Sequence, residues 1–228
     1  MKTIRSKYCQ QVFFTRFKIF VLAIVLLFAC EPPVYFLSPQ PSGIKNLPGI
    51  PTDYTGSYFN SKDSTRLVVT ASSVIHYETD YSIMTREQLY EEIDTVIDHD
   101  TLVYVSPNWT LEINLIGDSA EFISRTVDTF FLAGPENYIR KWREFLFLNM
   151  NTNPGKWQVF IMKIQNERLY FDEMLKATEV DTFKNMVSIT PVFDAVENIV
   201  TEYYLDPSKR KLSRILKSKE VSFDYVRQ

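Results

Sequence analysis

Short runs of apolar residues separated by polar turns fill the chain from Thr55 onward and predict strands of an antiparallel sheet. Residues 109–116 alternate apolar with polar side chains, as is typical of a strand with one buried face. Two hairpins are predicted, one from residues 66–71 and 74–79 and one from residues 157–164 and 168–174. Further strands are predicted at residues 56–59, 93–97, 101–105, 121–126, 127–132 and 144–149.

Two segments have the pattern of helices. Thr85 to Gln88 forms a capping box that predicts a short helix near residues 85–92. Asp206 as a cap and Pro207 at the first helical position predict an amphipathic helix near 207–217, with an apolar stripe that packs against the sheet. The stripe consists of Leu212, Ile215 and Leu216. Residues 196–204 fit either a last strand or a helix.

These elements predict a mainly β fold, an antiparallel β-meander that forms a barrel or a strongly curved sheet. The order of the elements is similar to that of lipocalin-like barrels, with an early Gly-x-Tyr strand and a late helix. This likeness concerns the fold and implies no particular ligand.

The first thirty residues have the pattern of an export signal. Five basic residues and no acid precede an apolar run at residues 19–30. The run has twelve residues, fewer than the ~20 that cross a bilayer as a helix, and Arg16 and Lys18 prevent its extension toward the N-terminus. A cleaved leader therefore fits this segment better than a permanent membrane span.

The end of this run, Leu27-Phe28-Ala29-Cys30, resembles the lipobox of bacterial lipoproteins, here of the type found in Bacteroidota envelope lipoproteins, and the resemblance covers residues 1–30 only. Phe28 departs from the family, which usually has a smaller residue there. The resemblance implies cleavage before Cys30, lipidation of its thiol, and attachment to a membrane of the cell envelope, with the outer membrane expected. The alternative is an uncleaved signal anchor in which Cys30 has no role.

The cysteine content agrees with lipidation. Cys9 would leave with the leader, so Cys30 would be the single thiol of the mature chain and could form no internal disulfide. Residues 1–29 are then a signal peptide. Six prolines between residues 32 and 51 predict a semi-rigid tether over 30–54, followed by a single β-rich domain over 55–228.

Composition excludes several classes of function. Without residues 1–29 the chain has 20 basic and 28 acidic residues, a formal charge of −8, so nucleic acid is not an expected partner. Only six glycines are present, which argues against glycine-rich phosphate loops, and no cofactor is predicted.

The chain contains no familiar catalytic or metal-binding pattern. Glu91, Glu92, Asp94, Asp98, His99 and Asp100 form an acid-rich stretch, but it lacks the spacing of a calcium loop and fits a solvated turn. His76 is expected to face solvent from a strand. No G-x-S-x-G elbow occurs, so neither a metal site nor an enzyme is predicted.

Two groups of side chains remain as candidates for binding. The tryptophans Trp109, Trp142 and Trp157 line a ligand cavity or, as aromatic residues in β-proteins usually do, fill the core. The basic C-terminal helix either contacts an anionic lipid or acidic partner or presents an ordinary soluble face.

Three functional hypotheses follow. The first is a non-enzymatic envelope lipoprotein that binds a partner protein or supports an envelope assembly. The second is a lipocalin-like carrier of a small hydrophobic ligand, which requires a continuous apolar cavity. The third is an envelope enzyme with an unfamiliar site around residues 91–100.

Overall fold

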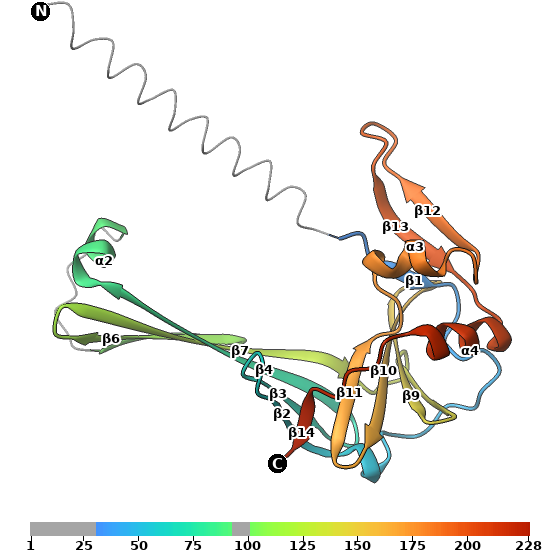
Figure 1. Ribbon diagram of the computed structural model, residues 1–228, viewed down its shortest axis with the longest axis horizontal. Helices are drawn as coiled ribbons and strands as arrows, with labels where there is room; N and C mark the ends of the chain where they lie inside the picture. Colours follow the sequence, from blue (N-terminus) through green and yellow to red (C-terminus); the bar gives the residue numbers. More distant parts are fainter. Residues whose placement is uncertain (1–30, 93–100) are drawn as a thin grey trace, which may run out of the picture. The chain divides into compact units, whose positions relative to one another are not determined.

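The computed structural model describes residues 31–92 and 101–228, and its fold is mainly β, with 53% of residues in strands and 13% in helices (Figure 1). The expected cleavage motif, Cys30 and the strand expected at 93–97 lie outside the described residues. The chain divides into two compact units. Unit 1 comprises Leu175–Leu205 and the described residues up to Val34, and unit 2 comprises Tyr35–Met174 and Asp206–Gln228.

Unit 2 is built on a large sheet whose described strand pairs are antiparallel. Its order is β1-β10-β11-β14-β2-β3-β4-β7-β6-β5, with β9 also paired to β10 and β8 paired to β9. The strands are β1 (Val34–Phe36), β2 (Gly56–Asn60), β3 (Thr65–Val69), β4 (Ser73–Thr85), β5 (Thr101–Ser106), β6 (Trp109–Ile116), β7 (Ser119–Leu132), β8 (Tyr138–Trp142), β9 (Phe145–Asn153), β10 (Lys156–Gln165), β11 (Arg168–Glu173) and β14 (Tyr225–Arg227).

Of the two predicted forms of the sheet, the structure shows the open, strongly curved one, because the described strands do not close into a barrel. Both predicted hairpins are confirmed, as β3 with β4 and as β10 with β11. The second hairpin turns through Asn166 and Glu167, which both have positive φ, as the type I′ hairpin turn requires.

The short helix after β4 is confirmed as α2 (Arg86–Glu92). Its capping box has both expected hydrogen bonds. The backbone amide of Gln88 donates to the Thr85 hydroxyl at 3.2 Å, and the backbone amide of Thr85 donates to Oε1 of Gln88 at 3.0 Å. These bonds satisfy two backbone donors that the first turn of a helix otherwise leaves unpaired.

The C-terminal helix, α4 (Lys209–Ser218), begins later than Asp206 and Pro207 predict, with Ser208 as its N-terminal cap residue. The Asp206 carboxylate instead accepts a hydrogen bond from the Ser38 hydroxyl at 2.7 Å. The predicted apolar stripe of α4 is buried.

The two central strands are longer than the sequence pattern predicts. Residues 121–126 and 127–132 form the single strand β7, and β4 continues to Thr85 instead of ending near residue 79. The two strands pair from Ser73 opposite Leu132 to Thr85 opposite Ser119. Asp80 and Ser82 lie beyond the predicted strand 74–79, yet together with Glu78 they occupy alternate positions on one face of this ladder.

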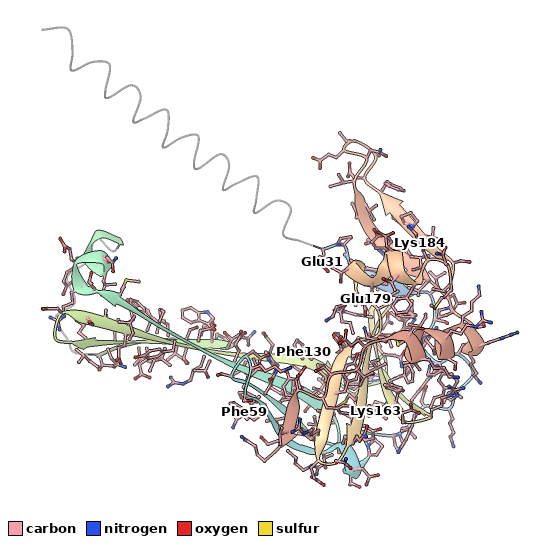
Figure 2. The ribbon with its side chains drawn as sticks, in the orientation of Figure 1. Glu31, Phe59, Phe130, Lys163, Glu179 and Lys184 are labelled. Carbon is pink, nitrogen blue, oxygen red and sulfur yellow. The ribbon has the colours of Figure 1, made fainter. Side chains whose placement is uncertain are left out.

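The main hydrophobic core of unit 2 lies on one face of the sheet. Tyr58, Leu67 and Leu148 are fully buried there, and the Tyr58 hydroxyl donates to the Tyr54 carbonyl at 2.9 Å. The His76 ring, expected to face solvent, is partly buried and stacks on Phe130 with 5.1 Å between ring centroids (Figure 2).

The proline-rich segment predicted as a tether is packed into the fold from Val34 onward. Val34 and Phe36 are buried, and Phe36 pairs with Trp157 of β10. The backbone amide of the buried Gln40 donates to Oδ1 of Asn149 at 2.5 Å. Nδ2 of Asn149 donates back to the backbone carbonyl of Gln40 at 2.9 Å. The segment ends in a 3-10 turn, η1 (Thr52–Tyr54).

Unit 1 is a hairpin preceded by two short helical turns, η2 (Ala177–Glu179) and α3 (Val180–Phe183). Its strands β12 (Ile189–Phe193) and β13 (Val200–Leu205) are antiparallel. The segment that fits either a strand or a helix is therefore a strand from Val200. Asp194 holds the hairpin loop, because its carboxylate accepts hydrogen bonds from the backbone amides of Val196 and Glu197. These bonds lower the pKa of Asp194.

Candidate binding surfaces

The most unusual feature of unit 2 is a four-stranded extension that we call the arm. It consists of α2, β5, β6 and the paired ends of β4 and β7, residues 79–85 and 119–125. β3 pairs only with residues 74–77 of β4, so β4 and β7 continue beyond it (Figure 1). On the far side β6 pairs with β7 and β5 pairs with β6.

One face of the arm, the inner face, has a small hydrophobic core of its own. Leu89 of α2 is 2% exposed and packs against Ile113 and Ala120 of the sheet. Other apolar residues pack around this cluster: Met84, Leu102, Leu111, Leu115 and Phe122. Helix α2 therefore covers the inner face near the end of the arm.

The opposite face, the outer face, carries large apolar side chains that no described residue covers. The ladder registers place Tyr81, Ile123 and Val103 in one row across the strands, and neighbouring rows add further apolar residues. Five residues of this face are from 57% to 77% exposed: Tyr81, Ile83, Val103, Val105 and Ile116. A group of exposed apolar side chains on one face of a sheet is a feature of interaction sites.

A ladder of hydrogen-bonded polar side chains crosses the outer face between these apolar residues. Glu112 accepts hydrogen bonds from Asn114 at 3.0 Å and from Arg125 at 3.1 Å, which lower the pKa of its carboxyl group. The Tyr81 hydroxyl donates to Glu121 at 2.8 Å, and this bond raises the pKa of Tyr81. Because these polar groups are already paired, a partner could cover them with little loss of hydrogen bonding.

A cavity of about 620 Å³ lies at the base of the arm, on the face of the sheet opposite the main core. Phe59 of β2 (Figure 2) lines it together with Tyr77 and Trp109. Arg66, whose guanidinium lies 4.6 Å from the centre of the Tyr77 ring, and Arg125 add positive charge. Glu78 also lines the cavity, so the lining is aromatic with charges of both signs.

A second cavity, of about 510 Å³, lies between α4 and the β8–β9 turn, and we call it the basic groove. Its lining contains five cationic side chains, one serine and one indole: Lys209, Arg210, Arg214, Lys217, Arg143, Ser213 and Trp142. The Arg143 guanidinium lies 4.7 Å from the centre of the Trp142 ring, a cation–π contact.

The turn that supplies Arg143 is conformationally strained. Trp142 and Phe145 face each other across a two-residue hairpin turn, and Arg143 has a φ of 56°. This left-handed conformation costs a non-glycine residue on the order of 1 kcal/mol. The pattern of residues 207–217 indicated the charges of α4, but nothing in the sequence pairs them with Arg143, which lies more than sixty residues earlier.

The structure places the three candidate tryptophans in different surroundings. Trp109 lines the cavity at the base of the arm, and Trp142 lines the basic groove. Trp157 is 9% exposed and stacks on Tyr138 with 5.1 Å between ring centroids. No single site therefore unites the three.

Much of the acid-rich stretch, including His99, lies outside the described residues. Within residues 31–92 and 101–228, no three His, Cys, Asp or Glu side chains are grouped so that they could hold a metal ion. In the same part of the chain, no helix has the length and apolar character needed to cross a membrane.

Comparison with known proteins identifies no relative: no family model matches the chain, and neither does any curated protein or solved structure.

Proposed function

We propose that this protein is a lipid-anchored lipoprotein of the bacterial cell envelope, held at the outer membrane through Cys30, and that it has a non-enzymatic role in binding a partner protein. The uncovered outer face of the arm is the observation that carries the binding role. The lipobox-like residues Leu27-Phe28-Ala29-Cys30 support the anchor.

The arm has the properties expected of a binding element. Its inner face has its own small core, which keeps the strands in register without help from the outer face. The outer face combines exposed apolar side chains with polar groups that are already hydrogen-bonded to one another. Val105 is 77% exposed, and unlike an isolated exposed valine it shares its face with four other apolar side chains that are more than half exposed.

Anchorage is tested by labelling cells with a clickable palmitate analogue. The wild-type protein is expected to take up label and to fractionate with the outer membrane. Cys30→Ser is expected to do neither, because it lacks the thiol. Equal labelling of the Cys30→Ser protein would contradict the proposed anchor.

Partner binding is tested with a photoreactive amino acid placed at Val105 in the native membrane. Val196, which is 91% exposed in the unit 1 hairpin, provides a matched control position. A discrete crosslinked species is expected from position 105 and not from 196. Val103→Asp, on the same outer face, should abolish it while the melting temperature stays unchanged. Identical crosslinking patterns from both positions would refute the role of the arm.

A second candidate, binding of a small ligand, is favoured by the cavity at the base of the arm. Its volume of about 620 Å³ is sufficient for a small molecule, and Trp109 would report on occupancy. Arg66, whose guanidinium lies over the Tyr77 ring, could receive an acidic group of an amphipathic ligand. A panel of fatty acids should change the Trp109 emission, measured as the difference between wild type and Trp109→Phe, and no change across the panel would reject this candidate.

A further inference from the structure

We propose that the basic groove binds the phosphate head groups of anionic membrane lipids, so that the domain docks on the membrane that holds its anchor. This inference takes anchorage from the proposed function and adds a second, protein-borne contact. The arm and its partner play no part in it.

The charges of the groove are concentrated on one face of α4. Lys209 and Lys217 are two turns apart, and Arg210 and Arg214 are one turn apart, while the opposite face buries its apolar stripe. Like charges one turn apart repel each other and weaken a helix. A helix that keeps this arrangement on an acidic protein is suited to an anionic ligand.

No acidic side chain neutralises these cations within the part of the chain that the structure describes. None of the five basic residues of the groove forms an ion pair there, and the groove lining contains no acid. Lys219, at the end of the same helix, shows the contrast: it is buried and pairs with Asp172 at 3.7 Å. The exposed cations of the groove are therefore available to external phosphates.

Trp142 favours a membrane surface as the source of those phosphates. Tryptophan is enriched where proteins meet the head-group region, because its ring is apolar and its N–H is polar. Clustered lysine and arginine beside such a ring is the composition that attracts a protein to anionic lipids. The partly exposed indole and the adjacent Arg143 together provide this combination.

The length of the chain limits the distance between the groove and the anchor. Gly43, thirteen residues after Cys30, accepts a hydrogen bond from the Lys209 ammonium group at 3.5 Å. Thirteen extended residues span at most about 45 Å, and the folded segment between them is shorter. Arg140 holds the chain on both sides of Gly43: it donates to the Pro41 carbonyl at 2.9 Å and to the Asn46 side chain at 2.8 Å.

The test uses the full chain in neutral detergent micelles, doped with phosphatidylglycerol brominated near the top of its acyl chains. Bromine quenches a nearby indole, and subtraction of the Trp142→Phe signal isolates the Trp142 emission. Phosphatidylglycerol should quench this emission at a concentration at least about tenfold lower than matched brominated phosphatidylcholine does, because several cations contribute. Molar sodium chloride should remove the difference.

Two triple variants test whether the groove is responsible. Lys209→Gln, Arg210→Gln and Arg214→Gln together should make the two lipids equivalent. A matched variant with Lys62→Gln, Arg168→Gln and Lys184→Gln, three exposed cations outside both cavities, should keep the preference. Arg143→Gln, outside the helix, should weaken it and covers the case in which the helix variant does not fold.

Three results would overturn the proposal. The first is equal quenching by the two lipids in the wild type. The second is loss of preference in both triple variants, which would indicate net charge alone. The third is displacement by millimolar glycerol phosphate at constant ionic strength, which would indicate a site for a soluble phosphate. Failure of palmitate labelling would refute anchorage separately, since the micelle assay needs no lipidated cysteine.

Discussion

The strands β4 and β7 run through two regions with different physical support, the body of unit 2 and the arm. In the body, their apolar face packs against further strands in the main core, where side chains such as Leu148 are fully buried. In the arm, only α2 covers the inner face, and among the described residues nothing covers the outer face. The same ladder is therefore a structural element in one region and a presented surface in the other.

The largest expected effect comes from a cavity in the body. Leu148→Ala removes a fully buried side chain from the main core and should lower the free energy of unfolding by about 4 kcal/mol. Urea unfolding followed by far-UV circular dichroism measures this loss. A loss below about 1 kcal/mol would show that the body does not depend on this core.

Alkaline pH should weaken the body next. Burial, with the charges of Asp53 and Glu144, raises the pKa of Tyr54 to about 12, above its ordinary value of 10. Below pH 10 both states keep the proton, and above it the unfolded chain ionises first. Stability should therefore fall between pH 10 and 12, by about 2–3 kcal/mol from this group.

Comparison with Tyr54→Phe isolates this contribution, because phenylalanine cannot ionise. The slope of stability against pH above 10 should become shallower in the variant, measured by urea unfolding at each pH. Burial also raises the pKa of Tyr58 and of Tyr225, so part of the slope should remain. An unchanged slope would contradict the role of Tyr54.

The same leucine deletion in the arm should have a smaller and more local effect. Leu89→Ala removes the side chain that holds α2 on the inner face and should destabilise the arm by about 2 kcal/mol. Native-state hydrogen exchange should show faster exchange in α2, β5 and β6 with little change in β10 and β11. Uniformly faster exchange would mean that arm and body unfold together.

The smallest effect is expected on the outer face. Val105→Thr replaces a side chain that is 77% exposed and should change the free energy of unfolding by less than about 0.5 kcal/mol. With the photoreactive residue moved to position 103 of the same face, it should nevertheless weaken the crosslink. A large loss of stability would show that the protein itself covers Val105.

Local patterns predicted much of the secondary structure. The capping box of Thr85 and Gln88 specified the start of α2, and the alternation over residues 109–116 specified β6, because both signals depend on neighbours within a few residues. Strand pairing could not be predicted in this way. Asp80 and Ser82 lie beyond the predicted strand 74–79, and they belong to β4 because β7 pairs with β4 as far as Thr85.

The candidate surfaces were predicted less completely than the fold. Tyr81 and Ile83 alternate with polar neighbours, which was a signal for an exposed strand. This short pattern lies beyond the predicted strand 74–79. Arg143 joins the charges of α4 only through the sheet that brings the β8–β9 turn to the helix. Contacts between residues so far apart depend on packing and leave no local pattern.

Side-chain spacing along the chain was sufficient to predict the mainly β class, the capped α2 and the buried stripe of α4, because each depends on neighbours a few residues apart. Tertiary structure decided the rest. It left the sheet open, packed the proline-rich segment from Val34 onward into the fold, and exposed the outer face of the arm. The reason is that pairing and burial depend on which distant segments meet, and only the folded chain brings those segments together.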